Sequence, residues 1–230
     1  MSTGENRHPS AGGNRDPSAG EIRNPMFARV FDRLCPLMER EVGPRRDQLL
    51  KGLSGHVLEV GAGNGINFSH YPPTVERVTA IEPEPYLRSK AANAARTAPV
   101  SVSVAQGTAE ALPLADGSVD ASVVSLVLCS VADQASALGE LRRVLKPGGE
   151  LRFMEHVRSS RSATKARAQK LLDGSGVWPR LAGGCHCARD TCAAIEAAGF
   201  TIEEVEQFAL GVSWLHTNPH VLGRARAPAA

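Results

Sequence analysis

A glycine-rich turn directly after a short apolar run restricts the fold of this chain more than any other feature. The run at 57–60 (VLEV) ends in three glycines spaced by two, within the stretch HVLEVGAGNGINFSHYPP at 56–73. Glycine allows positive φ and lets a backbone approach a ligand closely. A buried strand that ends in such a turn predicts a ligand site beyond the carboxyl ends of a parallel sheet.

The rest of the chain alternates between strand-like and helix-like patterns. We predict strands at 56–60, 77–83, 100–107, 119–125, 149–157, 201–210 and 219–228. We predict helices at 85–97, 132–146, 162–174 and 189–200. Repeated β-α units with nearly continuous apolar strands favour a Rossmann-like, doubly wound α/β fold with a mostly parallel seven-stranded sheet. The last two strands have no helix between them, so we expect an edge hairpin with an antiparallel strand.

The region before the first strand divides into two parts. Residues 1–24 are rich in Gly, Ser, Asn, Arg and Pro, which predicts a disordered tail. Apolar residues recur every three or four positions over 25–38, which predicts an amphipathic helix, and a second helical piece follows at 45–53. We expect one domain over 25–230, with the first helix and the loop at 172–187 acting as a lid.

Composition narrows the class of partner. The chain has 230 residues and a net charge of +2, from 26 basic and 24 acidic residues, so we expect neither a nucleic acid nor a membrane surface as partner. No apolar run reaches the roughly 18 residues that span a bilayer, and the N-terminus lacks the apolar segment of a signal peptide. We expect a cytoplasmic monomer or homodimer that acts on a small molecule.

The residues around the turn indicate which ligand it binds. A dinucleotide-binding turn has the spacing G-x-G-x-x-G, whereas the third glycine here, Gly65, comes one place early. Glu59 before the turn would repel a pyrophosphate but suits an ammonium group. Glu82 ends the second strand, where a carboxylate can accept both hydroxyls of a ribose, and GTAEALP at 107–113 is placed to line an adenine. A ligand with an amino-acid head, a ribose and an adenine is S-adenosylmethionine.

Three stretches, LEVGAGNG, AIEP and LRRVLKPGGELRFME, resemble the motifs of class I S-adenosylmethionine-dependent methyltransferases over roughly 25–225. This chain departs from many relatives at Thr108, where they carry Asp, so Glu110 or a backbone carbonyl is expected to take the adenine amino group. The resemblance implies roles in cofactor binding for Glu59, Gly61, Ala62, Gly63, Asn64 and Gly65 (methionine end), Glu82 and Pro83 (ribose), Thr108, Ala109 and Glu110 (adenine), and Leu126 (beneath the sulfonium).

A narrower resemblance concerns the methyl acceptor. NFSHYPP, DGSVD, LVLCSV, FMEHV and GGCHCARDTC at 183–192 are similar to the thiol S-methyltransferases, which include membrane-anchored mammalian proteins and soluble bacterial ones. The resemblance implies methylation of a small-molecule thiol, with a dithiol or disulfide natural product as one candidate. Methylation of carbon or oxygen on a quinone precursor or polyketide-like molecule stays open. So do a dinucleotide oxidoreductase and a non-enzymatic cofactor-sensing module.

Methylation of a thiol requires the thiolate, and a free thiol has a pKa near 8.5. A neutral histidine can take the proton, or a cation can lower the pKa of the thiol. Each candidate also has a structural alternative: a strand-end hydrogen bond, a helix N-cap, an ion pair or simple packing. The candidate catalytic residues are Tyr71, His156, His186, Arg189 and Asp190.

The five cysteines are an odd number, and without an export signal they argue against a disulfide framework. Cys185, Cys187 and Cys192 have the spacing C-x-C-x4-C, which differs from the paired C-x2–4-C of structural zinc sites, so we predict no metal. Cys185 or Cys187 could instead capture a disulfide substrate by exchange. Cys129, inside an apolar run, is expected to pack in the core.

Overall fold

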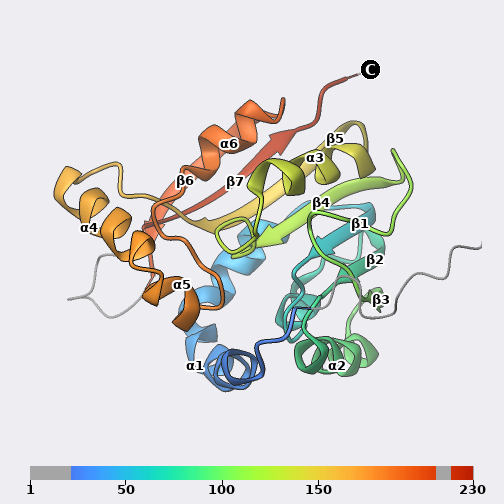
Figure 1. Cartoon of the computed structure of the whole chain (residues 1–230). Helices are drawn as coiled ribbons and strands as arrows, with labels where there is room; N and C mark the ends of the chain where they lie inside the picture. The colour runs from blue at the N-terminus through green and yellow to red at the C-terminus, as the bar shows by residue number, and fades with distance from the viewer. Residues whose placement is uncertain (1–21, 211–218, 230) are drawn as a thin grey trace, which may run out of the picture.

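The computed structural model describes residues 22–210 and 219–229, which form a seven-stranded sheet with helices on both faces (Figure 1). Most of the expected N-terminal tail, residues 1–21, lies outside the described residues. The strands are β1 (Gly55–Val60), β2 (Val75–Ile81), β3 (Ser101–Ala105), β4 (Val119–Ser125), β5 (Leu145–His156), β6 (Thr201–Ala209) and β7 (Pro219–Arg226). The α-helices are α1 (Pro25–Leu50), α2 (Pro85–Ala94), α3 (Gln134–Val144), α4 (Ala163–Gly174), α5 (Val177–Leu181) and α6 (Thr191–Ala197), with 3-10 turns η1 (Ile66–His70) and η2 (Ala95–Thr97).

The strand order, β3-β2-β1-β4-β5-β7-β6, confirms the doubly wound sheet. The chain runs outward from β1 through β2 to β3 and then returns with β4 on the other side of β1, all in parallel pairs. The order therefore reverses between β1 and β4, and ligands of such sheets bind beyond the strand ends at this point. β7 is the antiparallel strand expected from the terminal hairpin, and it lies between β5 and the edge strand β6.

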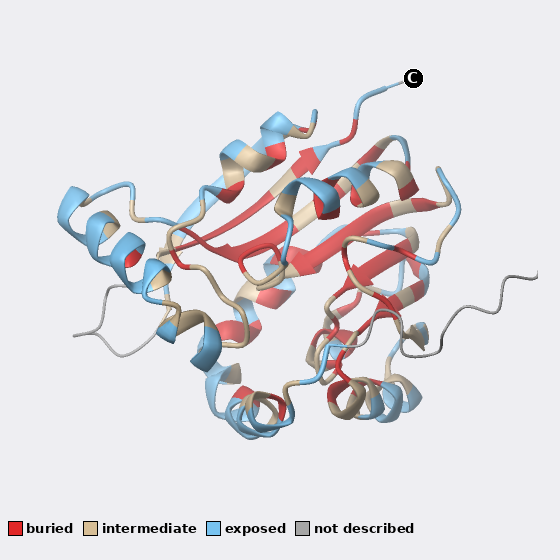
Figure 2. Ribbon diagram, in the orientation of Figure 1, coloured by how far each residue is buried: buried red, intermediate tan, exposed pale blue. Residues whose placement is uncertain are grey.

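The core has one apolar layer on each face of the sheet, and Figure 2 shows the central strands buried between them. On one face, Leu138 and Leu141 of α3 and Ile195 of α6 pack against the strands. On the other face, Leu49 of α1 and Ala91 of α2 do the same. Because both faces are covered, the central strands are apolar on both sides, as their sequences predicted, whereas the edge strand β6 is mostly exposed.

The N-terminal region forms one helix, α1, instead of the two helical pieces predicted at 25–38 and 45–53. Pro36 and Pro44 lie inside it, and each removes a helical hydrogen bond. Its buried face runs the whole length of the helix, and Asn24 accepts a hydrogen bond from the Phe27 N–H at its start. Tertiary burial therefore outweighs the local preference for a break.

The helix predicted over 132–146 is shorter at both ends in the structure. Asp133 caps its start, and the neighbouring strands set its end. α3 ends at Val144, and the Ser118 N–H donates to the Val144 carbonyl (2.8 Å). Leu145 pairs with Val119, so β5 begins before the Pro-Gly-Gly sequence at 147–149 that predicted the end of the helix. The loop expected at 172–187 contains a short helix, α5.

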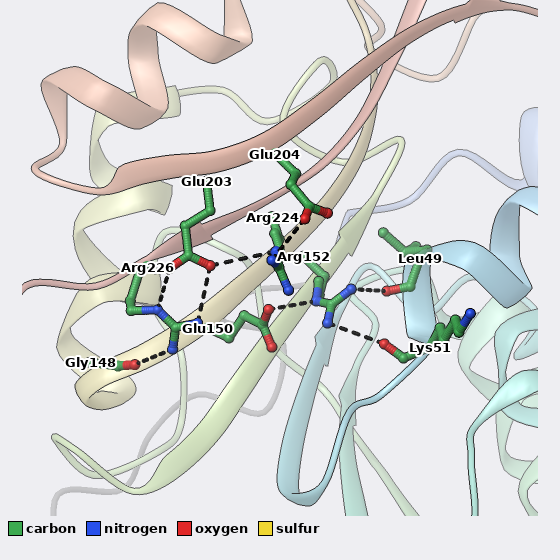
Figure 3. Close-up of polar contacts among 9 residues, drawn as sticks. All are labelled: Leu49, Lys51, Gly148, Glu150, Arg152, Glu203, Glu204, Arg224 and Arg226. Atoms are coloured by element: carbon green, nitrogen blue, oxygen red, sulfur yellow. Dashed lines mark hydrogen bonds and ion pairs between the residues drawn. The ribbon is translucent and has the colours of Figure 1, made fainter.

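Ion pairs join the two strands of the edge hairpin, β6 and β7, to each other (Figure 3). Arg224 of β7 pairs with Glu204 of β6 (2.8 Å), and Arg226 pairs with Glu203 (2.6 Å). Arg152 of β5 donates to the Lys51 carbonyl (3.1 Å) just past the end of α1. These contacts lie at the end of the sheet away from the glycine turn, so they stabilise the scaffold and not the site.

Candidate active site

The turn after β1 adopts the conformation that its three glycines allow. The φ values of Gly61, Gly63 and Gly65 are +68°, +58° and +82°. A Cβ on Gly61 would overlap the Val127 side chain, and one on Gly65 would lie 2.8 Å from the Phe68 ring. A Cβ on Gly63 would meet only a ring of α1, at 3.3 Å. The first and third glycines are therefore required by packing, while the middle one faces α1 across the turn.

Glu82, just past the end of β2, connects the turn to the next loop. The Gly63 N–H donates to its Oε2 (2.7 Å) and the Glu84 N–H donates to its Oε1 (2.9 Å). Glu82 is only 5% exposed, and burial raises the pKa of its carboxyl to about 7. Each carboxylate oxygen can accept a further hydrogen bond, so the group can still receive ribose hydroxyls. Pro83, beside it, is partly exposed.

Glu59 binds inward, to the segment that follows the turn. Its two oxygens accept hydrogen bonds from Asn67 Nδ2 (2.8 Å) and the Tyr71 hydroxyl (2.7 Å), and Arg46 of α1 donates to Asn67 (2.6 Å). Burial raises the pKa of Glu59 to about 7. The structure thus brings Glu59 and Tyr71 together as a buried pair, which favours a role in shaping the cofactor loop over direct contact with the acceptor.

The segment after β3 is ordered by its own contacts. Thr108 and Ala111 form an isolated antiparallel bridge, and Ala109 is buried in the core beside it. The Glu110 carboxylate accepts from the Ala132 N–H (2.9 Å), near the start of α3. Only Oε1 of that carboxylate is engaged, so Glu110 and a backbone carbonyl both stay candidates for the adenine amino group.

The turn after β4 lies on the opposite side of β1 from β2 and contains strained backbone. Leu126 has a φ of +60°, uncommon for a residue with a side chain, and its N–H donates to the Met154 carbonyl (2.8 Å). The buried Glu155 carboxylate accepts from the N–H groups of Val127, Leu128 and Cys129 (2.9, 3.0 and 3.1 Å). Burial raises the pKa of Glu155 to about 7.

Sequence reasoning missed this role of Glu155. Its signal was a carboxylate inside an otherwise apolar strand, which is costly unless it receives hydrogen bonds. Glu155 holds the loop that faces the glycine turn, since a Cβ on Gly61 would reach Val127 of that loop.

His156, at the end of β5, is 4% exposed and lies against a cysteine. Its Nδ1 is 3.3 Å from the Cys185 sulfur, and its ring stacks on His220 at 5.0 Å. The His186 N–H donates to the Cys129 carbonyl (2.8 Å), which fixes the loop at 182–187 over the turn after β4.

Arg189 and Asp190 are both engaged with the protein. The Arg189 guanidinium donates to the carbonyls of Leu128 (2.6 Å) and Val131 (2.8 Å). Asp190 is the N-cap of α6 and pairs with Arg158 (2.8 Å), which is the structural alternative considered for it. These two residues position loops in the structure.

An open cleft of about 700 Å³ lies between α4 and the loop after α5. His186 and Arg189 line it together with three further cations, Arg158, Arg167 and Lys170. Asp173 also faces the cleft, but its carboxylate accepts from the Cys187 and Ala188 N–H groups (2.9 and 2.8 Å). The cleft lining does not include the glycine turn, so the cleft is separate from the part of the site that the turn forms.

α1 covers the glycine turn through Asp32, a residue that sequence reasoning missed. Its carboxylate accepts from Asn64 Nδ2 (3.1 Å) and the Tyr86 hydroxyl (2.8 Å), and Lys90 lies 3.3 Å away. A Cβ added to Gly183 would overlap the Phe27 ring, so α1 also packs against the loop at 182–187. These contacts give the expected lid a physical basis.

The chain's residues fit the cofactor that the turn suggests. The turn after β1 is built from glycines at positive φ, and Glu82 presents a buried carboxylate at the neighbouring strand end. Among residues 22–210 and 219–229, no group of three or more His, Cys, Asp or Glu side chains is arranged to hold a metal ion.

The fold and this site together define a class I methyltransferase. The sequence matches the family described as Methyltransferase domain over residues 58–153. Human thiol S-methyltransferase TMT1A is 39% identical over 185 residues, which cover 77% of this chain and 74% of that protein. Human thiol S-methyltransferase TMT1B is 35% identical over 205 residues, covering 84% and 82%. The chain belongs to the S-adenosylmethionine-dependent methyltransferase family that includes these thiol S-methyltransferases, and S-adenosylmethionine is its cofactor.

Solved structures share the fold at lower sequence identity. A putative methyltransferase from Bacillus halodurans has a TM-score of 0.66 and 18% identity, over 81% of this chain and 98% of that one. A methyltransferase from Thermotoga maritima has a TM-score of 0.63 and 23% identity, over 88% and 96%. No helix within the described part of the chain has the length and apolar character needed to cross a bilayer.

Proposed function

We propose that this methyltransferase transfers its methyl group to the thiol of a small molecule. The observation that carries the proposal is the identity of 35–39% with two human thiol S-methyltransferases over at least 74% of their length. A dithiol or disulfide natural product is the acceptor class that we favour, because Cys185 and His156, a pair suited to sulfur chemistry, adjoin His186 of the cleft.

The chain's residues perform two tasks in this reaction. Glu82 and the glycine turn hold the cofactor, and the loop that Glu155 fixes closes the other side of the crevice. S-adenosylmethionine supplies a methyl group on a positively charged sulfur, already activated for attack by a nucleophile. The protein then only has to bring the acceptor sulfur into line and to maintain it as the thiolate.

The cationic cleft favours the thiolate. Arg158, Arg167 and Lys170 line it, and nearby positive charge lowers the pKa of a thiol. His186 lines the same cleft, whereas the His156 ring is buried against Cys185. We therefore assign proton removal to His186 and loop positioning to Arg189.

The test is transfer from labelled S-adenosylmethionine to a panel of small thiols, phenols and quinols, followed by mass spectrometry. Methylated thiols support the proposal. Methylation of phenol oxygen or ring carbon alone would replace it with the alternative acceptor class. Cofactor binding without transfer to any acceptor would favour a sensing module.

A further inference from the structure

Cys129, Cys185 and His156 form a compact cluster that methyl transfer does not require. The residues come from the turn after β4, the loop after α5 and the end of β5. The Cys185 sulfur lies 3.3 Å from His156 Nδ1 and is also within hydrogen-bonding reach of the Cys129 thiol. No polar partner of His156 Nε2 is present among the described residues, although the ring is almost fully buried.

The surrounding backbone holds the two sulfur atoms close together. The His186 N–H binds the Cys129 carbonyl (2.8 Å), so the residues adjoining each cysteine are tied to one another. The Glu155 carboxylate fixes the Cys129 N–H from below (3.1 Å). A disulfide requires neighbouring backbones with converging side chains, and the hydrogen bond between the Cys129 carbonyl and the residue after Cys185 makes the two backbones neighbours.

The two thiols differ in exposure and in acidity. Cys185 is partly exposed, and hydrogen bonds from Cys129 and His156 lower its pKa despite burial. Cys129 is 1% exposed, and the Cys185 sulfur, burial and the Glu155 charge raise its pKa. An accessible thiolate beside a buried thiol is the arrangement that thiol–disulfide exchange uses, the first as the attacking group and the second as the resolving group.

We propose that Cys185 and Cys129 form an exchange site for small-molecule disulfides, the oxidised form of the acceptor thiol. The Cys185 thiolate attacks one sulfur of the disulfide and forms a mixed disulfide. The S–S bond breaks, and the leaving thiolate takes the proton held by His156. The Cys129 thiol then gives its proton to His156 and attacks the Cys185 sulfur, which releases the second thiolate.

The electrons balance in this sequence. One substrate disulfide is reduced to two thiols, and the protein dithiol is oxidised to a Cys129–Cys185 disulfide. A low-molecular-weight thiol returns the protein to the dithiol state by the same exchange in reverse, becoming oxidised itself. The thiols released become methyl acceptors only if the proposed function is right, since exchange alone needs no S-adenosylmethionine.

The test uses the full chain, reduced, freed of reductant and mixed with 4,4′-dithiodipyridine at pH 6. We expect Cys185 to react roughly tenfold faster than an ordinary thiol, because ionisation outweighs the lower nucleophilicity of an acidic thiolate. The wild type should release two equivalents of pyridine thione in the fast phase, and peptide mapping should find a Cys129–Cys185 disulfide. The Cys129→Ala variant should release one equivalent and retain a mixed disulfide on Cys185.

Cys192→Ser is the matched control, because Cys192 is also partly exposed and burial raises its pKa to about 11. This variant should keep the fast phase, and Cys185→Ala should lose it, which tests the site even if Cys129→Ala does not fold. A fast phase that survives in Cys185→Ala, or a mapped disulfide between other cysteines, would overturn the proposal.

Methylation of a thiol supplied in reduced form is measured separately on the wild type. Methylation without selective exchange at Cys185 would refute the exchange proposal and leave the proposed function intact. Selective exchange without methylation of any thiol would support the exchange proposal and refute the proposed function.

Discussion

The Gly63 N–H donates a 2.7 Å hydrogen bond to the buried Glu82 carboxylate and so joins the turn after β1 to the end of β2. The glycine supplies the backbone conformation, and the carboxylate fixes that conformation from the neighbouring strand. If Glu82 also binds the ribose, as we propose, cofactor binding and local stability depend on the same pair.

Replacing Glu82 should weaken cofactor binding. Glu82→Gln removes the charge that strengthens the hydrogen bonds of the carboxylate, which are worth about 1.5–3 kcal/mol to a charged group. We expect the dissociation constant for S-adenosylmethionine, measured by titration calorimetry, to rise about tenfold or more. Glu76→Gln changes an exposed glutamate on the same strand and should bind normally. Equal affinity in the two variants would mean that Glu82 does not contact the ribose.

A paired substitution separates backbone strain from packing in the turn. Gly61→Ala and Gly117→Ala both place a side chain at positive φ, which costs about 1–2 kcal/mol. The space around Gly117 is open, whereas a Cβ on Gly61 overlaps Val127. Urea unfolding should therefore show a loss of about 1 kcal/mol for Gly117→Ala and about 3 kcal/mol for Gly61→Ala. Similar losses in both variants would show that Val127 moves aside.

Stability should fall as the pH rises from about 5 to 7. Burial raises the pKa values of Glu59, Glu82 and Glu155 to about 7, against about 4.3 in an unfolded chain. In this window these three carboxyls hold more protons in the native state than in the unfolded state, so their contribution to the free energy of unfolding falls as the pH rises. The lowered pKa values of Cys185 and His56 oppose this effect with fewer groups. Carboxyls whose pKa is lowered, such as Asp120, titrate below this pH window.

Glu59→Gln tests this effect, because an amide can accept from Asn67 and donate to the Tyr71 oxygen in place of the protonated acid. Unfolding free energies at pH 5, 6, 7 and 8 should decline less steeply than in the wild type, while Glu76→Gln should follow the wild type. A steeper decline would contradict the assignment.

Asp32 should control closure of α1 over the glycine turn. Asp32→Ala removes the hydrogen bonds to Asn64 and Tyr86. We expect the KM for S-adenosylmethionine to rise severalfold and limited proteolysis to cut near α1 more quickly. Asp47→Ala, on the same helix but paired with His70, is the control. If both variants behave alike, the change in KM and in proteolysis results from a general loss of helix stability and not from the contacts of Asp32 with Asn64 and Tyr86.

A proton-accepting role for His186 has a characteristic pH dependence. His186→Gln should lower kcat about a hundredfold at pH 7, within the range of general base catalysis. Activity should recover near pH 9, where a thiol ionises without assistance. His56 lies at the start of β1, the end away from the glycine turn, so His56→Gln should leave the pH profile unchanged. A deficit that is constant from pH 7 to 9 would assign His186 a structural role.

The sequence determined the elements of this protein and the identity of its cofactor loop. Short apolar runs between helical patterns predicted all seven strands, and three glycines after β1 predicted the turn, because such local patterns depend on side-chain sequence and on the φ values that glycine permits. The position of Glu82 at a strand end next to that turn was also predicted, and its hydrogen bond to the Gly63 N–H confirms that position.

Tertiary structure decided which side chains meet. Asp32 lies 32 positions before Asn64, and Cys185 lies 29 positions after His156, so no local pattern could pair them. Tyr71 is buried and donates to Glu59. α1 continues through two prolines because burial against the sheet outweighs the preference of proline to break a helix. Contacts between distant segments depend on how the helices pack on the sheet, which the sequence specifies only through the complete fold.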